Sequence, residues 1–123
     1  MRRILIIDDD VEFRQMLRKM LEQAGYEVIE AADGKEGMKL FREAPTDLVI
    51  TDILMPEQDG VETVIELKRE FPDAKIIAIS AGGRIDSEKY LKLAERLGAT
   101  HTFGKPFNRG ELLQAIEEML GED

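Results

Sequence analysis

Short apolar runs alternate along the chain with longer stretches in which apolar residues recur at helical spacing. Residues 3–7 form a compact, β-branched run that predicts a buried central strand. Residues 48–51 and 75–79 repeat this pattern, whereas residues 27–31 alternate polar and apolar side chains as an edge strand does. A shorter run at residues 100–103 predicts the fifth strand.

Each predicted strand is followed by a predicted amphipathic helix. Three helix starts carry a capping residue followed by a glutamate three positions later, at Asp33–Glu36, Asp59–Glu62 and Asn108–Glu111, and Asp10 is expected to cap the first helix. Gly25 and Gly98 are expected to end helices. The expected inward faces are Phe13, Leu17, Met20, Leu21 and Ala24; Val61, Val64 and Ile65; Ser87, Tyr90, Leu91 and Ala94; and Leu112, Ile116, Met119 and Leu120.

Five alternations of strand and helix predict an α/β fold with a parallel sheet, helices on both faces and right-handed crossovers. The 123 residues suffice for one core and are too few for two, so we expect a single doubly wound domain over residues 1–123.

Composition narrows the range of partners. The formal net charge of -9 argues against nucleic-acid binding by this domain, because phosphate backbones require a basic face. The absence of cysteine excludes a disulfide framework and a thiolate metal site, and it fits a reducing cytoplasm. The apolar run after Met1 is too short for a signal peptide or a spanning helix, so we expect a cytoplasmic protein without a membrane partner.

Polar side chains with complementary chemistry stand at the ends of four predicted strands. Asp8 and Asp9 follow the first strand, Asp52 the third, Ser80 the fourth and Lys105 the fifth. The carboxyl ends of parallel strands share one edge of the sheet, so these groups can converge there.

The chemistry of this set favours phosphoryl transfer. Carboxylates are hard oxygen ligands that suit Mg²⁺, and a lysine and a hydroxyl suit phosphoryl oxygens. One carboxylate can act as a nucleophile and form an aspartyl phosphate.

Four motifs, each placed after its strand, resemble those of the receiver domains of bacterial two-component response regulators. They are ILIIDDD at 4–10, DLVITDILMPEQDG at 47–60, IIAISA at 76–81 and KPF at 105–107. The resemblance extends over essentially the whole chain. It implies a CheY-like, flavodoxin-like (βα)5 fold with the strand order 2-1-3-4-5.

The resemblance also implies roles for individual residues. Asp52 corresponds to the phosphoacceptor of the family, and Asp8 and Asp9 correspond to its acid pair. Asp9 and Asp52 would bind Mg²⁺ directly, Asp8 largely through water, and the backbone carbonyl of Leu54 would be the third protein ligand.

By the same resemblance, Ser80 and Lys105 would hold the phosphoryl oxygens. The phosphoryl donor would be a histidine kinase or a histidine phosphotransfer protein, and the only catalysis would be self-phosphorylation and autodephosphorylation. A downstream effector would recognise the surface of the fourth helix, fifth strand and fifth helix, in a monomer or a phosphorylation-dependent dimer.

The sequence departs from the family at the expected output surface. The family usually carries an aromatic residue three positions before the lysine, where this chain has Thr102. Phe103 is predicted to point to the opposite sheet face, because side chains alternate along a strand. The segment around Gly82-Gly83 is also a few residues longer than usual.

Other interpretations of these residues remain open at this point. The acids at 8–10 could serve only as helix caps, and His101 is best explained as an ordinary strand residue. The domain could be a pseudo-receiver that binds partners without phosphorylation. It could also be a flavodoxin-type FMN carrier, although three aspartates would replace the phosphate-binding loop that such a protein needs.

Overall fold

The computed structural model describes residues 2–53, 60–81, 92, 95–96, 98–105 and 107–121. Its strands are β1 (Arg3–Ile7), β2 (Glu27–Ala31), β3 (Leu48–Asp52), β4 (Ile76–Ala81) and β5 (His101–Lys105). Its labelled helices are α1 (Val11–Gln23), α2 (Gly34–Glu43), α3 (Gly60–Glu70) and α5 (Arg109–Leu120). All strand pairs are parallel and the order is β2-β1-β3-β4-β5, which confirms the predicted fold class and strand order.

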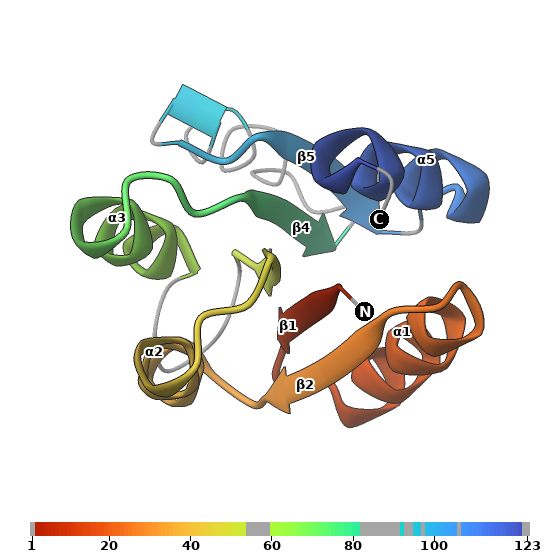
Figure 1. Ribbon diagram of the computed structural model, residues 1–123, viewed down its shortest axis with the longest axis horizontal. Helices are drawn as coiled ribbons and strands as arrows, with labels where there is room; N and C mark the ends of the chain where they lie inside the picture. Colours follow the sequence, from red (N-terminus) through yellow and green to blue (C-terminus); the bar gives the residue numbers. More distant parts are fainter. Residues whose placement is uncertain are drawn as a thin grey trace.

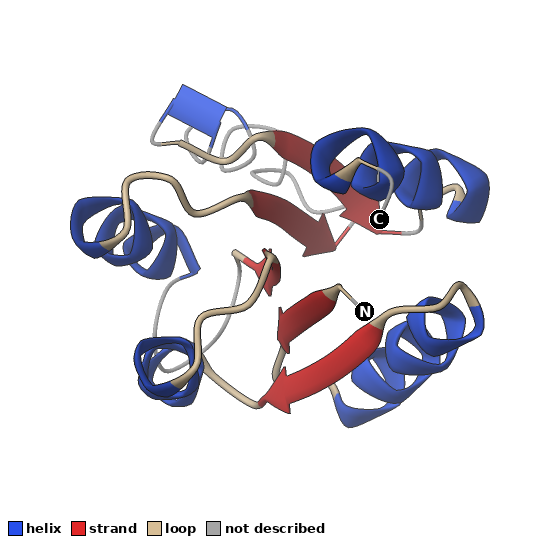
Figure 2. Ribbon diagram, viewed as in Figure 1, coloured by secondary structure: helices blue, strands red, loops and turns tan. Residues whose placement is uncertain are grey.

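Helices cover both faces of the sheet, α1 and α5 on one face and α2 and α3 on the other (Figure 1; Figure 2). Alternate residues of each central strand therefore enter different cores. Ile4 and Ile6 of β1 pack with α1 and α5, whereas Leu5 and Ile7 pack with α2 and α3. Both faces of the central strands are buried, which explains why their sequences are continuous apolar runs.

The predicted caps form where the chain is described. Asp10 Oδ1 accepts from the Phe13 N–H at 3.1 Å, Asp33 Oδ1 from Glu36 at 2.8 Å, and Asn108 Oδ1 from Glu111 at 3.0 Å. Each cap satisfies a backbone donor in the first helical turn, which has no partner within the helix. Gly25 follows Ala24, the C-cap of α1, and has φ of 98°, the conformation that ends helices. Asp59 lies outside the described residues.

Two of the predicted inward residues are exposed. Ile65 in α3 is 42% exposed, because Val61, Val64 and Leu67 form the buried stripe and Ile65 lies beyond its edge. Ala24 is also exposed, since it is the C-cap of α1 rather than part of its buried face. The predicted inward face of the fourth helix, Ser87, Tyr90, Leu91 and Ala94, lies outside the described residues.

The strands extend further towards the candidate site than the sequence predicted. Asp52 is the last residue of β3, β4 continues past Ser80 to Ala81, and β5 ends at Lys105 instead of Phe103. The backbones of Asp52, Ser80 and Lys105 are therefore fixed by the sheet itself.

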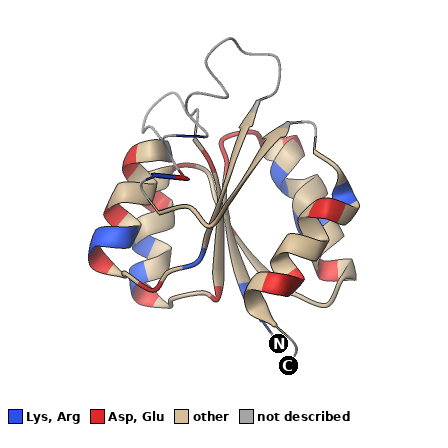
Figure 3. Cartoon of the chain, turned by 90° about the horizontal axis from the view of Figure 1, so that it is seen from above, with Lys and Arg blue, Asp and Glu red and all other residues tan. Residues whose placement is uncertain are grey.

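Acidic and basic residues are interspersed over the flanking helices, and the termini lie together at the end of the sheet where β1 begins (Figure 3). In the part of the chain that is described, no helix is long and apolar enough to cross a membrane.

Helix α2 packs tightly against the sheet at Gly37. A Cβ placed there would lie 2.4 Å from Cδ1 and 2.7 Å from Cγ1 of Ile7, which is fully buried in β1. The glycine is required by this packing and not by a special backbone angle, because its φ is not positive.

We therefore expect Gly37→Ala to destabilise the protein by about 1–3 kcal/mol through overpacking, although alanine is the better helix former. Chemical denaturation measures the change in the free energy of unfolding. Gly110→Ala, at an exposed position of α5, is the matched control, where the new Cβ would lie 3.3 Å from Asn108 Oδ1 alone. A Gly37→Ala variant as stable as Gly110→Ala would contradict this account of the α2–β1 contact.

Candidate functional site

The register of β1 and β3 places two carboxylates side by side. The paired residues run from Ile4↔Leu48 to Ile7↔Thr51, so the next positions along the two strands are Asp8 and Asp52. Asp8 is 1% exposed and Asp52 is 6% exposed, so neither side chain can project freely into solvent. Two parallel strands thus end in adjacent, buried acids.

Asp9 completes an acidic cluster at this edge. One carboxylate oxygen from each of Asp8, Asp9 and Asp52 lies within 4.8 Å of the other two, and Asp9 is the exposed member. Three convergent oxygen donors with one solvent-facing side are a suitable donor set for a divalent cation that keeps some of its water. The prediction that these acids share one site agrees with this geometry, and helix capping alone does not explain the cluster because Asp10 is the cap.

Ser80 contributes a buried hydroxyl to the same edge of the sheet. It is fully buried in β4, and its Oγ has no hydrogen-bond partner among the described residues. A buried hydroxyl without a partner is costly, and native proteins rarely leave one unsatisfied. This hydroxyl is therefore available to a group outside the described residues.

The remaining predicted site residues are placed only in part. Lys105 ends β5 in register with Ala81, which brings its backbone to the same edge as Ser80. Leu54 and the Gly82-Gly83 segment lie outside the described residues. Thr102 is paired with Ala78, whose side chain packs in the core next to α2 and α3, whereas Phe103 packs in the core with α1 and α5. The expectation that Phe103 does not take the position of the missing aromatic is consistent with this packing.

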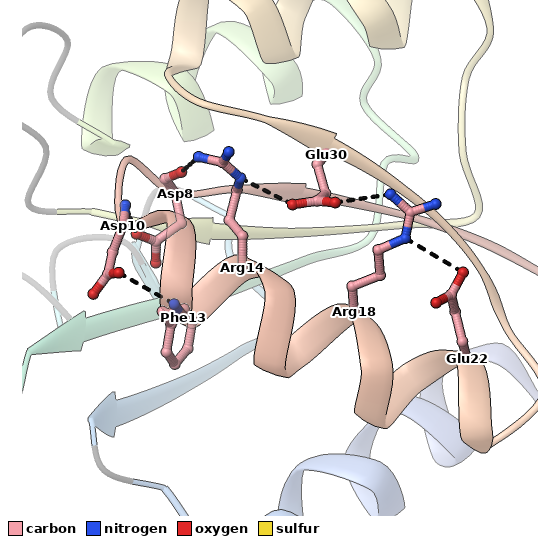
Figure 4. A network of polar contacts seen from close by, with 7 residues as sticks. All are labelled: Asp8, Asp10, Phe13, Arg14, Arg18, Glu22 and Glu30. Carbon is pink, nitrogen blue, oxygen red and sulfur yellow. Dashed lines mark hydrogen bonds and ion pairs between the residues drawn. The ribbon is translucent and has the colours of Figure 1, made fainter.

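Asp8 is held by a polar network that sequence analysis missed (Figure 4). Its backbone N–H donates to the Ala31 carbonyl at 3.1 Å, and its Oδ1 accepts from the Asp10 N–H at 2.9 Å. Arg14 Nη1 donates to the Asp8 carbonyl at 2.7 Å and Arg14 Nε donates to Glu30 Oε1 at 3.1 Å. The sequence signal is Glu30, a charged residue at a strand position that faces α1.

Glu30 lies between two arginines of α1. Arg18 Nη1 donates to Glu30 Oε2 at 2.8 Å, so both carboxylate oxygens are occupied. The hydrogen bond from Arg18 lowers the pKa of Glu30, and the bond from Arg14 adds to this effect against the opposing effect of burial. The same contact, together with Glu22, raises the pKa of Arg18.

Comparisons with known proteins agree with this fold. The family described as the response regulator receiver domain matches residues 4–117. The chain is 35% identical over 119 residues to the chemotaxis protein CheY of Thermotoga maritima, and the matched region covers 96% of this chain and 97% of that protein. It is 40% identical over 117 residues to the response regulator GtcR of Aneurinibacillus migulanus, covering 95% of this chain but 47% of that protein.

Solved structures give the same result. The response regulator TrrA of Thermotoga maritima, in complex with Mg²⁺ and BeF, has a TM-score of 0.87 at 35% identity and covers 98% of this chain and 100% of its own. The Vibrio cholerae chemotaxis protein CheY4 has a TM-score of 0.85 at 32% identity, covering 98% and 99% of the two chains. The chain thus spans nearly all of the CheY proteins and about half of GtcR.

The parallel sheet, with its strand-end acids, is that of a signalling domain of the two-component class. The chain belongs to the response regulator receiver family. Membership of this family favours the receiver interpretation over the flavodoxin-type FMN carrier.

The crowding of like charges has a measurable consequence for stability. Two carboxylates about 4 Å apart repel by roughly 4 kcal/mol at an effective dielectric constant of about 20. We expect Asp9→Asn and Asp52→Asn to raise the melting temperature by several degrees in EDTA, since each removes a repelling charge at nearly constant shape. Each should also reduce the stabilisation by millimolar Mg²⁺, because the cation binds the folded arrangement.

Asp73→Asn is the control for a change in net charge. Asp73 is exposed and precedes β4, at the opposite edge of the sheet from the acidic cluster. If thermal unfolding gives the three variants the same melting temperature in EDTA and the same shift with Mg²⁺, the three acids do not form one electrostatic unit.

The shifted pKa of Glu30 predicts a pH-dependent contribution to stability. A carboxyl with a lowered native pKa stabilises the fold above its ordinary value of 4.5, and this stabilisation is lost as the pH falls through the native pKa. At pH 7, Glu30→Gln should lose roughly 1–2 kcal/mol, because the two guanidinium bonds weaken while the shape is kept.

Urea unfolding at pH 7 and at decreasing pH tests this expectation. The difference between wild type and Glu30→Gln should narrow below pH 4.5 and largely vanish below the native pKa. Glu27→Gln is the control on the same strand, where the exposed Glu27 lies 3.8 Å from Arg3 Nε. A difference that is independent of pH would show that the Glu30 charge is not what stabilises the fold.

Proposed function

We propose that residues 1–123 form one receiver domain that accepts a phosphoryl group on Asp52 in a Mg²⁺-dependent reaction. The observation that carries the proposal is the convergence of the Asp8, Asp9 and Asp52 carboxylates within 4.8 Å at the strand ends. The buried hydroxyl of Ser80, which has no partner among the described residues, supports it, because a phosphoryl oxygen would supply an acceptor.

Asp52 is the proposed nucleophile because it ends the central strand. One Asp52 carboxylate oxygen attacks phosphorus as the P–N bond of a phosphohistidine donor breaks, and the histidine nitrogen leaves with the electron pair of that bond. The product is an acyl phosphate. Water later attacks the same phosphorus, which regenerates the carboxylate and releases inorganic phosphate.

The neighbouring residues orient the phosphoryl group. Asp8, Asp9, Asp52 and the backbone carbonyl of Leu54 would hold Mg²⁺, which when bound neutralises charge on the carboxylates and the phosphoryl oxygens. The Ser80 hydroxyl would donate to one phosphoryl oxygen, and Lys105 would pair with another. These roles give each sequence-predicted residue a function at one edge of the sheet.

The proposed partners follow from the family. A histidine kinase or histidine phosphotransfer protein would supply the phosphoryl group in the cytoplasm, and a downstream effector would bind the surface of the fourth helix, β5 and α5. Phosphorylation would shift a two-state equilibrium of that surface, in a monomer or a phosphorylation-dependent dimer. Because Thr102 replaces the usual aromatic, this shift would depend on Ser80 and the segment at Gly82-Gly83 and not on rotation of a β5 ring.

Intact-mass spectrometry after incubation with acetyl phosphate and Mg²⁺ tests the proposal. Wild type should gain one phosphate, which EDTA should prevent, and Asp52→Ala should gain none. Asp73→Ala is the matched control and should be phosphorylated like wild type, since its carboxylate lies at the other edge of the sheet. Wild type that gains no phosphate would favour the pseudo-receiver, and an Asp52→Ala variant that gains one would show that another residue is the acceptor.

A further inference from the structure

Arg14 connects the acidic cluster to the framework of the domain. From the second turn of α1, its guanidinium donates in two directions, to the Asp8 carbonyl at 2.7 Å and to Glu30 Oε1 at 3.1 Å (Figure 4). The side chains of Arg14 and Glu30 are 15% and 20% exposed, so both bonds are largely shielded from water. A planar guanidinium with two fixed partners has little freedom to rotate.

The bond to the Asp8 carbonyl acts on both members of the acid pair. The atoms from Asp8 Cα through the carbonyl to Asp9 Cα lie in one rigid peptide plane. Holding the carbonyl oxygen therefore fixes the orientation of the plane, which sets the direction in which the Asp9 backbone leaves β1. The Asp8 N–H is already fixed by Ala31, so the guanidinium removes the main remaining freedom between the two acids.

Glu30 determines which way the guanidinium points. Its two carboxylate oxygens are taken by Arg14 and Arg18, one turn apart on α1, which aligns the edge strand β2 with the helix. In the described part of the chain, Arg18 makes no hydrogen bond to the segment of Asp8 and instead pairs with Glu22 at 3.3 Å. The two arginines are therefore a natural matched pair: both stabilise the α1–β2 contact and only Arg14 reaches the acid pair.

We propose that Arg14, oriented by Glu30, is a positioning residue that sets the geometry of Asp8 and Asp9 for the divalent cation. The inference rests on the proposed function, since it assigns a role toward the cation of that same site. Arg14 acts through the backbone and does not touch the cation or the phosphoryl group. A residue that orients a metal ligand in this way commonly changes metal affinity by about 10-fold or more when it is replaced.

Positioning and simple electrostatics predict opposite results for Arg14→Gln. Removing a positive charge near a cation site should strengthen Mg²⁺ binding if charge alone matters. Releasing the peptide plane should weaken it. Arg18→Gln removes the same charge and the same kind of ion pair to Glu30, so it reports the effect of charge and of α1–β2 stability without the backbone contact.

The experiment measures the Kd for Mg²⁺ by isothermal titration calorimetry on the full chain, at a temperature where circular dichroism shows each variant folded. We expect Arg14→Gln to raise the Kd about 10-fold and Arg18→Gln to leave it within about 2-fold of wild type. Both variants should lower the melting temperature in EDTA. Arg14→Lys keeps the net charge and should disturb folding less than Arg14→Gln. Its Kd for Mg²⁺ should also rise, because a single ammonium cannot reproduce the two directed hydrogen bonds of the guanidinium.

The outcomes separate this inference from the proposed function. Wild-type Mg²⁺ binding with an unchanged or lower Kd in both Arg14 variants would overturn the positioning role and leave the proposed function standing. Equal increases in Kd for Arg14→Gln and Arg18→Gln would also overturn it, because the effect would then be one of helix stability. A wild-type chain that binds no Mg²⁺ would overturn the proposed function and the inference with it.

Discussion

The main constraint on the structure is that it must hold like charges close together at the carboxyl ends of its parallel strands. The register of β1 and β3 makes Asp8 and Asp52 neighbours, and both are buried. Their repulsion opposes folding, so apolar packing elsewhere must exceed it. The central strands bury side chains on both faces, against α1 and α5 and against α2 and α3, which anchors the strands that carry the acids.

Much of this arrangement is encoded locally and could be predicted from the sequence. Apolar runs specify the strands, and helix caps at Asp10, Asp33 and Asn108 specify where α1, α2 and α5 begin. The convergence of Asp8 and Asp52 was predictable because both residues lie at carboxyl ends of parallel strands, and because the family resemblance implied a strand order in which β1 and β3 are neighbours. The fold class therefore follows from the pattern of the sequence, whereas the strand order was expected only from the resemblance.

The rest could not be predicted because it depends on distances between elements. The sequence does not determine how closely α2 approaches β1 at Gly37. It also does not determine where the buried stripe of α3 ends, so helical spacing predicts a buried Ile65 where the structure has an exposed one. The network of Arg14 and Glu30 joins residues 16 positions apart across a helix and a strand, and only the packing of α1 on β2 brings them together. Charged residues on amphipathic elements are usually solvated, so their pattern alone does not distinguish this pair from surface charges.

The strands on the two sides of the acidic cluster are constrained to different degrees, and this difference determines which of them can move when a ligand binds at the cluster. On the β1 side, Asp8 is fixed by Ala31, Asp10 and Arg14, so its backbone has little room to respond to a new ligand. On the β4 side, the buried Ser80 hydroxyl has no partner among the described residues. A phosphoryl group on Asp52 would therefore gain a new contact with Ser80 while leaving β1 nearly unchanged. A ligand shifts an equilibrium only through contacts that differ between two states, so the structural response to the proposed phosphorylation is expected on the side of β4 and β5.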